Sequence, residues 1–330
     1  MYNIILVTGS AGFIGSNLIS ELLKNKINIV VGIDIVNDYY DVSLKYKNLE
    51  RNKNDRFVNF FIDISNKIEV NKIFNEWDIK EVYHLAAQAG VRYSINHPEE
   101  VIRTNIIGFQ NILDNVVSHN IKKFVYASSS SVYGNMHDNE INDELNPCDE
   151  QKSPYAVSKR ANELMAKTYS YLYPDIQMSG LRFFTVYGPY MRPDLAIGKF
   201  TKAIFNNEPI EIYGDGTKER DFTYIDDIVR IMITIMNSDK VWSHEIFNIG
   251  YGNSISINEM VKTIKNCINP NYDKIIYKED AEGDVNKTLA VNDKIKQWFN
   301  EEPKIEIHKG IEMYVNWFRK NISNNNDSIT

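Results

Sequence analysis

NIILVTGSAGFIG, residues 3–15, joins a short apolar run to a glycine-rich turn near the start of the chain. The branched apolar residues of positions 3–8 predict a strand buried on both faces, as in parallel sheets. Gly9, Gly12 and Gly15 then let the backbone turn tightly into a helix, which we predict over residues 16–26. Free amides at the start of such a helix favour an anion. The stretch therefore predicts the pyrophosphate site of a dinucleotide.

The same alternation of strand and helix continues along the first half of the chain. Apolar runs recur at residues 27–34, 58–63, 81–86, 123–128 and 178–183. Such a pattern predicts an α/β fold with a Rossmann-type doubly wound parallel sheet. Beyond residue 184 the rhythm breaks, which indicates a smaller α/β substrate-binding lobe.

Two later segments are expected to return to the first unit, a helix over residues 224–236 and a strand over residues 245–250. The predicted NAD-binding domain therefore spans 1–184 plus about 222–250, and the substrate lobe spans 185–221 plus about 251–320. Residues 321–330 lack apolar periodicity and are expected to form a mobile tail.

Composition excludes several classes of function. The 330 residues carry a net charge of −7, which argues against a nucleic-acid partner. Two distant cysteines and six scattered histidines offer no metal site. The apolar stretches are too short to span a bilayer and no signal peptide precedes the first strand. We expect a cytoplasmic protein without metal or membrane partner.

Asp34 closes the second predicted strand. A carboxylate there accepts both ribose hydroxyls of an adenosine and repels a 2′-phosphate, and no arginine follows it, so NAD is expected rather than NADP. Asp63 and Ile64, at the end of the third strand, are expected beside the adenine. For Asp63 the alternative is an acid that caps a turn or helix.

A second set of polar residues begins a helix after residue 153. Ser153 suits the N-cap and Pro154 the first helical position. Tyr155 and Lys159 stand four residues apart and so share one face, where the lysine is expected to favour the phenolate of a tyrosine base. A surface Tyr–Lys pair is the alternative.

ASSSSVYG, residues 127–134, carries four serines at the end of a predicted buried strand. A linker is the ordinary interpretation of a serine run, but a linker would not continue a buried strand. Ligands of open α/β sheets bind at the carboxyl ends of the strands. A hydroxyl here is therefore expected to share a hydrogen bond with the phenol and a reacting alcohol.

TGSAGFIG (8–15), SSSSVYG (128–134) and YAVSK (155–159) together resemble the extended short-chain dehydrogenase/reductase family. Its sugar-nucleotide branch includes 4-epimerases, 4,6-dehydratases and decarboxylases, and the resemblance extends to about Arg319. Within the branch the chain is most similar to the UDP-glucuronate 4-epimerases. That closer similarity rests on residues 37–45, 84–94, 182–194, 220–227 and 283–285.

The resemblance implies a set of functional residues. Catalysis is expected from Ser129, Tyr155 and Lys159. Cofactor binding is expected from Gly9, Gly12, Phe13, Ile14, Gly15, Asp34, Asp63, Ile64, Ala86, Gln88, Tyr155 and Lys159. Substrate binding is expected from Arg92, Ser130, Ser131, Thr185, Arg192, Arg220 and Asp284, with Arg220 on the diphosphate and Asp284 on a ribose. His84 is expected to be structural.

The implied reaction is 4-epimerisation of UDP-glucuronate to UDP-galacturonate through a 4-keto sugar. Ser130 and Ser131 stand where the related dehydratases carry an Asp-Glu pair, and the decarboxylases carry glutamate in place of Ser131. Galactose-type epimerases carry asparagine in place of Thr185 and tend to have an arginine near Ala281. One departure from the family is Met191, where glycine is usual, which is expected to shift the loop that carries Arg192.

Three alternatives stay open at this point. The first is a 4-epimerase of UDP-glucose or UDP-N-acetylglucosamine, and the second is a UDP-glucuronate decarboxylase. The third is a non-catalytic module that senses NAD or a nucleotide sugar. The family resemblance also implies a homodimer, formed by two sheet-flanking helices of each copy.

Overall fold

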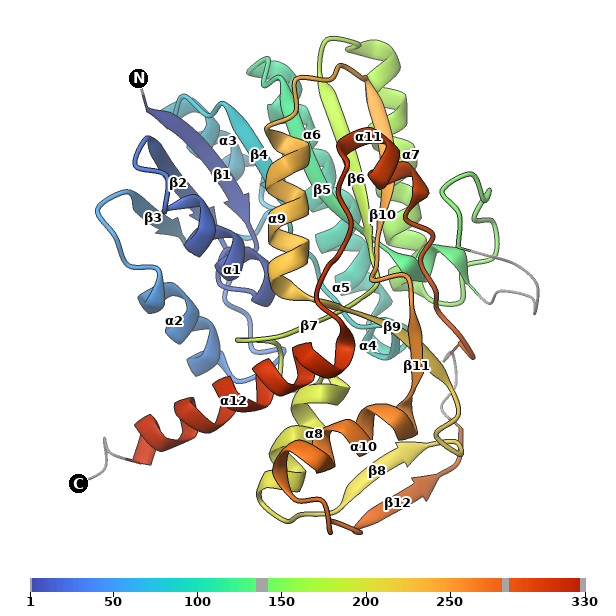
Figure 1. Cartoon of the computed structure of the whole chain (residues 1–330). Helices are drawn as coiled ribbons and strands as arrows, with labels where there is room; N and C mark the ends of the chain where they lie inside the picture. Colours follow the sequence, from blue (N-terminus) through green and yellow to red (C-terminus); the bar gives the residue numbers. More distant parts are fainter. Residues whose placement is uncertain (1, 135–141, 281–284, 327–330) are drawn as a thin grey trace.

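A computed structural model describes residues 2–134, 142–280 and 285–326 of the chain. Its larger unit is a seven-stranded sheet in the order β10-β6-β5-β4-β1-β2-β3 (Figure 1). Every pair of neighbours in it is parallel. The strands are β1 (Asn3–Thr8), β2 (Asn28–Ile33), β3 (Phe57–Phe60), β4 (Glu81–His84), β5 (Lys123–Ser129), β6 (Gln177–Phe183) and β10 (His244–Ile249). The sheet confirms the expected doubly wound α/β fold.

Helices cover both faces of this sheet. On one face lie α1 (Phe13–Leu22) and α9 (Ile225–Met236), and on the other α3 (Lys67–Glu76), α6 (Gly108–Ser118) and α7 (Pro154–Leu172). Successive side chains of a strand point to opposite faces. Accordingly Ile5 and Val7 of β1 join the core beneath α1 and α9, while Leu6 joins the core beneath α3 and α6.

Shorter elements follow the carboxyl ends of three strands and border the site described below. They are α2 (Val42–Arg51), α4 (Val91–Asn96), α5 (Pro98–Ile102), the π-helix η1 (Arg103–Ile107) and the 3-10 helix η2 (Ser130–Tyr133).

A smaller unit packs below the sheet in Figure 1. It contains a three-stranded sheet of β7 (Thr185–Tyr187), β9 (Glu219–Tyr224) and β11 (Ser254–Ser256), and a parallel pair of β8 (Ile210–Tyr213) and β12 (Ile275–Lys278). Its helices are α8 (Ala196–Phe205), α10 (Ile257–Ile268) and α12 (Ile307–Asn326).

The course of the later chain differs from the prediction at two places. β10 pairs with β6 in the large sheet, but α11 (Asp293–Phe299) also returns there, with Phe299 5.3 Å from Phe247 between ring centroids. The domain boundaries given above remain a proposal. Residues 321–326, expected in a mobile tail, continue α12.

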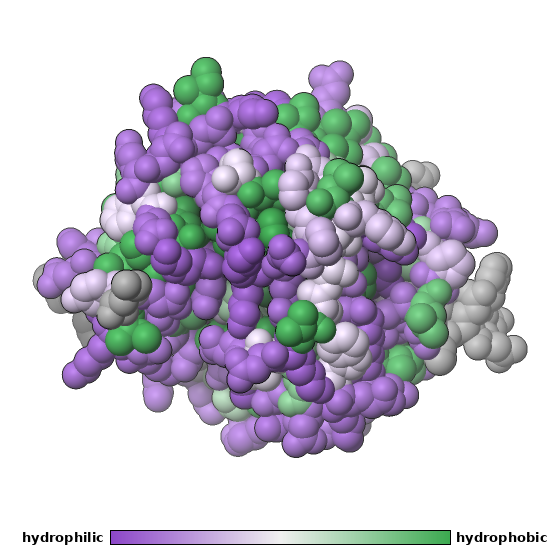
Figure 2. Space-filling model, turned by 90° about the horizontal axis from the view of Figure 1, so that it is seen from above, coloured by the Kyte–Doolittle hydropathy of each residue, from purple (hydrophilic) through white to green (hydrophobic). Residues whose placement is uncertain are grey.

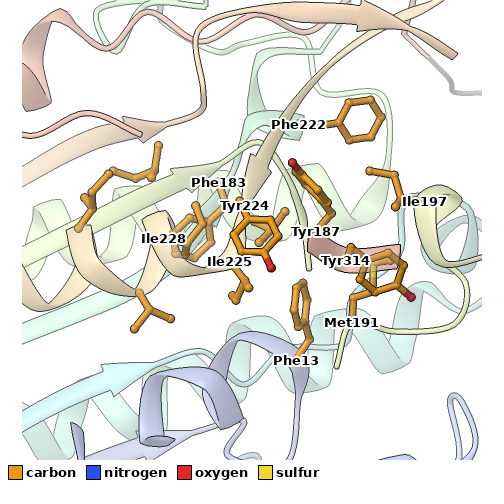
Figure 3. Close-up of a cluster of buried hydrophobic side chains, with 14 of the residues drawn as sticks. Phe13, Phe183, Tyr187, Met191, Ile197, Phe222, Tyr224, Ile225, Ile228 and Tyr314 are labelled. Atoms are coloured by element: carbon orange, nitrogen blue, oxygen red, sulfur yellow. The ribbon is translucent and has the colours of Figure 1, made fainter. Parts of the chain in front are cut away.

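One apolar cluster joins the two units (Figure 3). Phe13 comes from the first turn of α1, Tyr187 and Tyr224 from the small sheet, and Tyr314 from α12. The rings of Tyr187 and Tyr224 meet edge to face at 5.4 Å. Because the units share a close-packed core, the space between them has a defined shape.

The face of the molecule seen from above in Figure 2 is mostly hydrophilic, with hydrophobic residues in scattered groups. None of the described helices has the length and apolar character needed to cross a membrane. Within the described ranges no three His, Cys, Asp or Glu residues are grouped so that they could hold a metal ion. Cys148 and Cys267 are both free thiols.

Asp221 of β9 ties three segments of the small unit together. Its side chain is fully buried and accepts backbone N–H bonds from Tyr251 at 2.8 Å, Gly252 at 2.9 Å and Ala290 at 3.0 Å. These donors belong to two separate loops. The carboxylate therefore fixes both loops against the strand that carries Arg220.

We predict that Asp221→Ala lowers the free energy of unfolding by about 3 kcal/mol or more, because an unpaired buried donor costs about 1–3 kcal/mol. Urea denaturation followed by circular dichroism measures the change. Asp239→Ala, at an exposed position, is the matched control and should shift stability by less than about 0.5 kcal/mol. Equal stabilities of the two variants would contradict the role given to Asp221.

Candidate active site

A cavity of about 550 Å³ opens at the carboxyl ends of β1, β2, β4 and β5. This is where the strand order reverses, the usual ligand position of a doubly wound sheet. All twelve residues expected to bind the cofactor line it, namely Gly9, Gly12, Phe13, Ile14, Gly15, Asp34, Asp63, Ile64, Ala86, Gln88, Tyr155 and Lys159. The fold thus brings together residues spread over 150 positions of sequence (159 minus 9), while their individual roles stay predictions.

The glycine-rich turn has no room for side chains. Gly9 has a φ of +73°, and a Cβ on it would lie 2.8 Å from the backbone nitrogen of Ala86. A Cβ on Gly15 would lie 2.2 Å from the carbonyl oxygen of Gly9. Gly12 is the N-cap, so α1 begins at Phe13, three residues earlier than predicted. The first amides of α1 therefore face the cavity directly, as binding of a pyrophosphate requires.

Asp34 closes the far side of this turn. Its carboxylate accepts the backbone N–H of Ala11 at 3.0 Å and that of Val36 at 2.8 Å. Burial raises the pKa of Asp34, while the hydrogen bond from Val36 and the charge of Lys45 oppose the rise. Lys45, a cation that the sequence reasoning did not single out, is buried and donates to the carbonyl oxygen of Asn37 at 2.7 Å.

Two further residues of the cavity carry information about the ligand. The side-chain oxygen of Gln88 accepts from Asn37 at 3.0 Å, but its buried Nε2 has no partner among the described residues. An orphaned donor in a ligand cavity fits a polar group of a bound dinucleotide. Asp63 lines the cavity, accepts the backbone N–H of Ser65 at 2.8 Å and forms an ion pair with Arg103 at 3.2 Å, and its place beside an adenine stays a prediction. β3 ends at Phe60, three residues before it.

Ser129, Tyr155 and Lys159 meet at the inner end of the cavity. Ser153 caps α7 by accepting from Ala156 at 3.2 Å, with Pro154 at the first helical position as predicted. This start places Tyr155 and Lys159 in the first two turns, facing the end of β5. The Lys159 ammonium donates to the carbonyl oxygen of Ala127 at 2.8 Å and lies 5.9 Å from the Tyr155 ring centroid.

The electrostatics of this group differ from the expectation in one respect. Burial raises the pKa of Tyr155, and the opposing hydrogen bond with Ser129 and charge of Arg192 are smaller. Burial also lowers the pKa of Lys159 to about 8, against the charge of Glu163. Burial thus disfavours the charged forms of both groups, the phenolate of Tyr155 and the ammonium of Lys159.

A second cavity of about 230 Å³ continues from the first, since Ser130, Ser131 and Thr185 line both. Arg92 and Arg220 line only the second, together with Lys152 and Lys287, which the sequence did not mark. Arg192 lines the larger cavity instead. Asp284 and Ala281 lie outside the described residues. No carboxylate belongs to the described lining of the second cavity.

The loop that carries Arg192 is stabilised by contacts between residues of the loop itself. Arg192 donates to both carboxylate oxygens of Asp194, at 3.1 and 2.9 Å. Gly188 and Tyr190 have φ of +140° and +66°, and Met191, which follows these two bends, turns its side chain into the apolar core (Figure 3). Met191 is thus accommodated away from the described lining of both cavities.

Two buried polar groups near the site were missed or left unassigned. Asn105, inside the π-helix, accepts from the backbone of Gln88 at 2.8 Å and donates to Ser158 at 2.9 Å, which joins the cofactor cavity to α7. A π-helix often marks a functional site, but it has no sequence signature. His84 bonds Thr8 at 2.8 Å, and burial lowers its pKa to about 3, which agrees with a structural role.

The glycine-rich crevice and the Tyr155–Lys159 pair define a dinucleotide-dependent enzyme of the short-chain dehydrogenase/reductase class. The family model described as "NAD dependent epimerase/dehydratase family" matches residues 5–250. The chain is 42% identical to a UDP-glucuronate 4-epimerase of Thermodesulfobacterium geofontis, over 96% of both chains. The chain therefore belongs to the NAD dependent epimerase/dehydratase family.

Two solved structures resemble the fold closely. One is UDP-glucuronic acid 4-epimerase from Bacillus cereus in complex with UDP-glucuronic acid and NAD, with a TM-score of 0.88, 33% identity, and coverage of 96% of this chain and 99% of that chain. The other is UDP-glucose 4-epimerase from Thermotoga maritima with UDP-glucose, with a TM-score of 0.87, 30% identity, and coverage of 97% and 99%.

We predict that Asp34→Asn lowers the preference for NAD over NADP about 10- to 100-fold, because the neutral amide no longer repels a 2′-phosphate. Calorimetric titration of cofactor-free protein with each dinucleotide gives the ratio of affinities. Asp38→Asn, at an exposed neighbouring position, should leave that ratio unchanged. A wild-type ratio in Asp34→Asn would reject Asp34 as the discriminating group.

Proposed function

We propose that the chain is an isomerase, an NAD-dependent 4-epimerase that interconverts UDP-glucuronate and UDP-galacturonate. The observation that carries the proposal is the second cavity, which combines four cationic side chains with neutral hydroxyls in a protein of net charge −7. A diphosphate linked to a uronate brings negative charge at both of its ends. Cations and hydroxyl donors without a carboxylate suit such a ligand.

The catalytic group supports removal of a proton from the 4-hydroxyl of the sugar. The Tyr155 phenolate accepts this proton, and Ser129 shares a hydrogen bond with the phenol and the reacting oxygen. NAD held by the residues of the larger cavity would supply the redox chemistry, which is removal of the C4 hydride and its later return. Return of both proton and hydride, the latter to the opposite face, inverts C4 and consumes no external oxidant.

The lining of the second cavity also accounts for the rotation that inversion requires. The sugar has to turn about its bond to the diphosphate while the diphosphate stays bound. Arg220 and Lys287 line this cavity and bring positive charge for the diphosphate, with Glu219 paired to Lys287 at 2.7 Å. Ser130, Ser131 and Thr185 are short neutral donors that hydrogen-bond a uronate carboxylate and leave space for the ring to turn.

Competing reactions lack the groups that they need. Dehydration requires an acid and a base near C5 and C6, and Ser130 and Ser131 supply neither. A decarboxylase of the related type would carry glutamate in place of Ser131. A sensing module has no need of Ser129, Tyr155 and Lys159 converging on one cavity. Epimerisation of UDP-glucose is the second candidate, since the Thermotoga maritima enzyme with UDP-glucose has a similar fold, but the similarity to UDP-glucuronate 4-epimerases is higher.

We predict that purified protein converts UDP-glucuronate to UDP-galacturonate without added NAD, and that absorbance at 340 nm does not accumulate. A tightly held cofactor that regains its oxidised form explains both results. Chromatography of the nucleotide sugars measures the product, with UDP-glucose and UDP-N-acetylglucosamine in parallel reactions. Turnover of UDP-glucose with none of UDP-glucuronate would reject the assigned substrate.

The same assay tests the assigned base. Tyr155→Phe should retain NAD and lose about 10²- to 10⁴-fold in kcat. Tyr171→Phe removes a hydroxyl from an exposed tyrosine of the same helix and should behave as wild type. Unchanged turnover in Tyr155→Phe would exclude Tyr155 as the base.

The proposed assembly is a homodimer formed through α7. Val157, Leu164 and Tyr171 recur every seven residues on this helix, which places them on one face, and each is at least half exposed. Ile102 and Ile107 are also exposed on the neighbouring α5 and η1. An unpartnered apolar stripe of this kind fits a second copy of the same helix. A cytoplasmic location remains a prediction.

We predict that Leu164→Glu converts the dimer to a monomer, because two like charges would be buried in a two-fold interface. Size-exclusion chromatography with light scattering gives the mass in solution. Val241→Glu changes an exposed apolar residue that lies outside α7 and should leave the mass unchanged. A wild-type mass for Leu164→Glu would place the interface elsewhere.

A further inference from the structure

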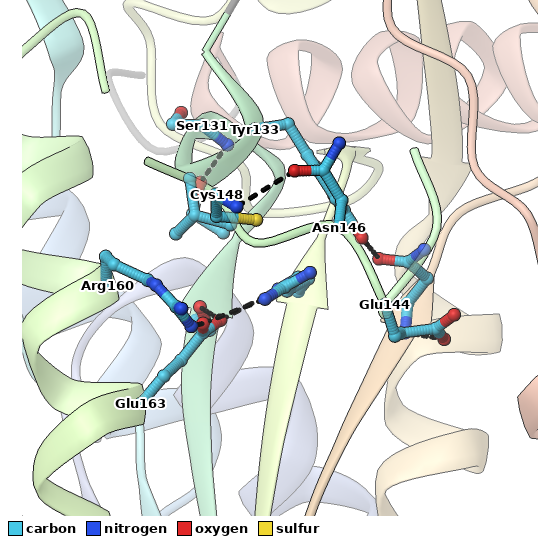
Figure 4. A network of polar contacts seen from close by, with 12 residues as sticks. Ser131, Tyr133, Glu144, Asn146, Cys148, Arg160 and Glu163 are labelled. Carbon is cyan, nitrogen blue, oxygen red and sulfur yellow. Dashed lines mark hydrogen bonds and ion pairs between the residues drawn. The ribbon is translucent and has the colours of Figure 1, made fainter. Parts of the chain in front are cut away.

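Glu163 is a buried carboxylate on the catalytic helix, one turn after Lys159 and two turns after Tyr155. It is 1% exposed, and so is its partner Arg182 on β6. Arg182 donates to both carboxylate oxygens, from Nε at 2.8 Å and from Nη2 at 2.9 Å. Arg160 adds a third bond at 3.0 Å, and Figure 4 shows its side chain directed at Glu163.

The fourth bond to this carboxylate comes from the serine run. Ser128 donates its hydroxyl to Glu163 at 2.6 Å, and in the sheet Ser128 lies directly beside Arg182. The residues on either side of Ser128 both serve the site, because Ala127 accepts from Lys159 and Ser129 bonds Tyr155. Glu163 therefore bonds Ser128, the residue that lies between the contact of Ala127 with Lys159 and the contact of Ser129 with Tyr155.

The charges around Lys159 come from a small number of elements. On α7 it faces Tyr155 and Glu163, and from β4 it faces His84, which is neutral because burial lowers its pKa to about 3. Arg182 and Arg160 act on the group through Glu163, whose pKa they lower in spite of its burial. Glu163 is thus the anion that opposes the loss of the proton from Lys159.

We propose that Glu163 is a positioning residue of the epimerase, one that holds Ser129 and Lys159 in register with Tyr155 through its bonds to Ser128 and Arg182. The inference rests on the proposed function. It gives the Glu163–Arg182 pair a role beyond folding, since a buried ion pair is by itself weak support for stability. A displacement of about 1 Å in a catalytic group costs about 100-fold in rate.

Glu163→Gln tests the role because it removes the charge and keeps the shape. We expect kcat to fall about 10- to 100-fold, with KM for UDP-glucuronate changed less than about threefold. The alkaline limb of the kcat profile should move to lower pH, since Lys159 loses its proton more readily without the nearby anion. Titration of ¹³C-labelled lysine by NMR reads the Lys159 resonance independently of turnover, and should show the same shift.

Two variants separate position from charge. Ser128→Ala removes the bond between Glu163 and the end of β5 and keeps the ion pair with Arg182. It should lower kcat without moving the alkaline limb of the pH profile. Glu163→Asp keeps the negative charge, so the alkaline limb of its pH profile should lie closer to that of the wild type than the limb of Glu163→Gln does. Arg160→Gln, which removes one outer bond to the same carboxylate, is the matched control and should change kcat less than about threefold.

The outcomes decide between this role and a purely structural one. Rates are expressed per molecule of retained NAD, so that a loss of folded protein does not count as a loss of catalysis. Wild-type kcat and pH profile in Glu163→Gln, with or without reduced thermal stability, would overturn the inference. If the wild-type protein converts none of the nucleotide sugars, the proposed function fails instead, and the lysine titration still tests Glu163.

Discussion

The absence of a side chain at Gly15 is the constraint on which the site depends. A Cβ there would lie 2.2 Å from the carbonyl oxygen of Gly9, so α1 approaches the end of β1 more closely than any other residue allows. This contact directs the first amides of α1 into the crevice where the strand order reverses. Asp34 then completes the turn by accepting the backbone N–H of Ala11. Phe13, in the same turn, enters the apolar cluster shared with the small unit.

The apolar cluster shared by the two units holds the two cavities next to each other, so that they form one continuous site. Tyr187 and Tyr224 pack between the large sheet and α12, and Asp221 fixes the loops beside them. The carboxyl edge of the sheet and the small unit therefore meet at Ser130, Ser131 and Thr185, and the cations of the second cavity come from both units. The residues proposed for hydride chemistry and those proposed to bind the sugar nucleotide therefore line one continuous space, as the proposed epimerisation requires.

Much of the fold could be predicted from local sequence patterns. A strand buried on both faces is a run of apolar residues, and a helix often begins with a capping residue that the sequence shows. β1 and the start of α7 at Pro154 agree with the prediction at the level of single residues. Errors arose where local signals were absent. β3 ends at Phe60, three residues before the predicted end at Asp63, although Phe61 and Ile62 are apolar, and α12 continues into a segment without apolar periodicity. The side chain of Met191 packs into the core, and its effect on the Arg192 loop stays a prediction.

The sequence by itself determined the class of fold, the glycine-rich cofactor turn, and the residue types of the catalytic group, since each depends on spacing within one or two elements. Only the tertiary structure decided the electrostatic surroundings of that group. Lys152 and Lys287 line the second cavity from segments 135 residues apart (287 minus 152). The carboxylate of Glu163 on α7 contacts Ser128 on β5 and Arg182 on β6, so the contact joins three elements. Burial, which no spacing reveals, raises the pKa of Tyr155 and lowers that of Lys159. Charge interactions depend on distance and dielectric in space, and neither is encoded by separation along the chain.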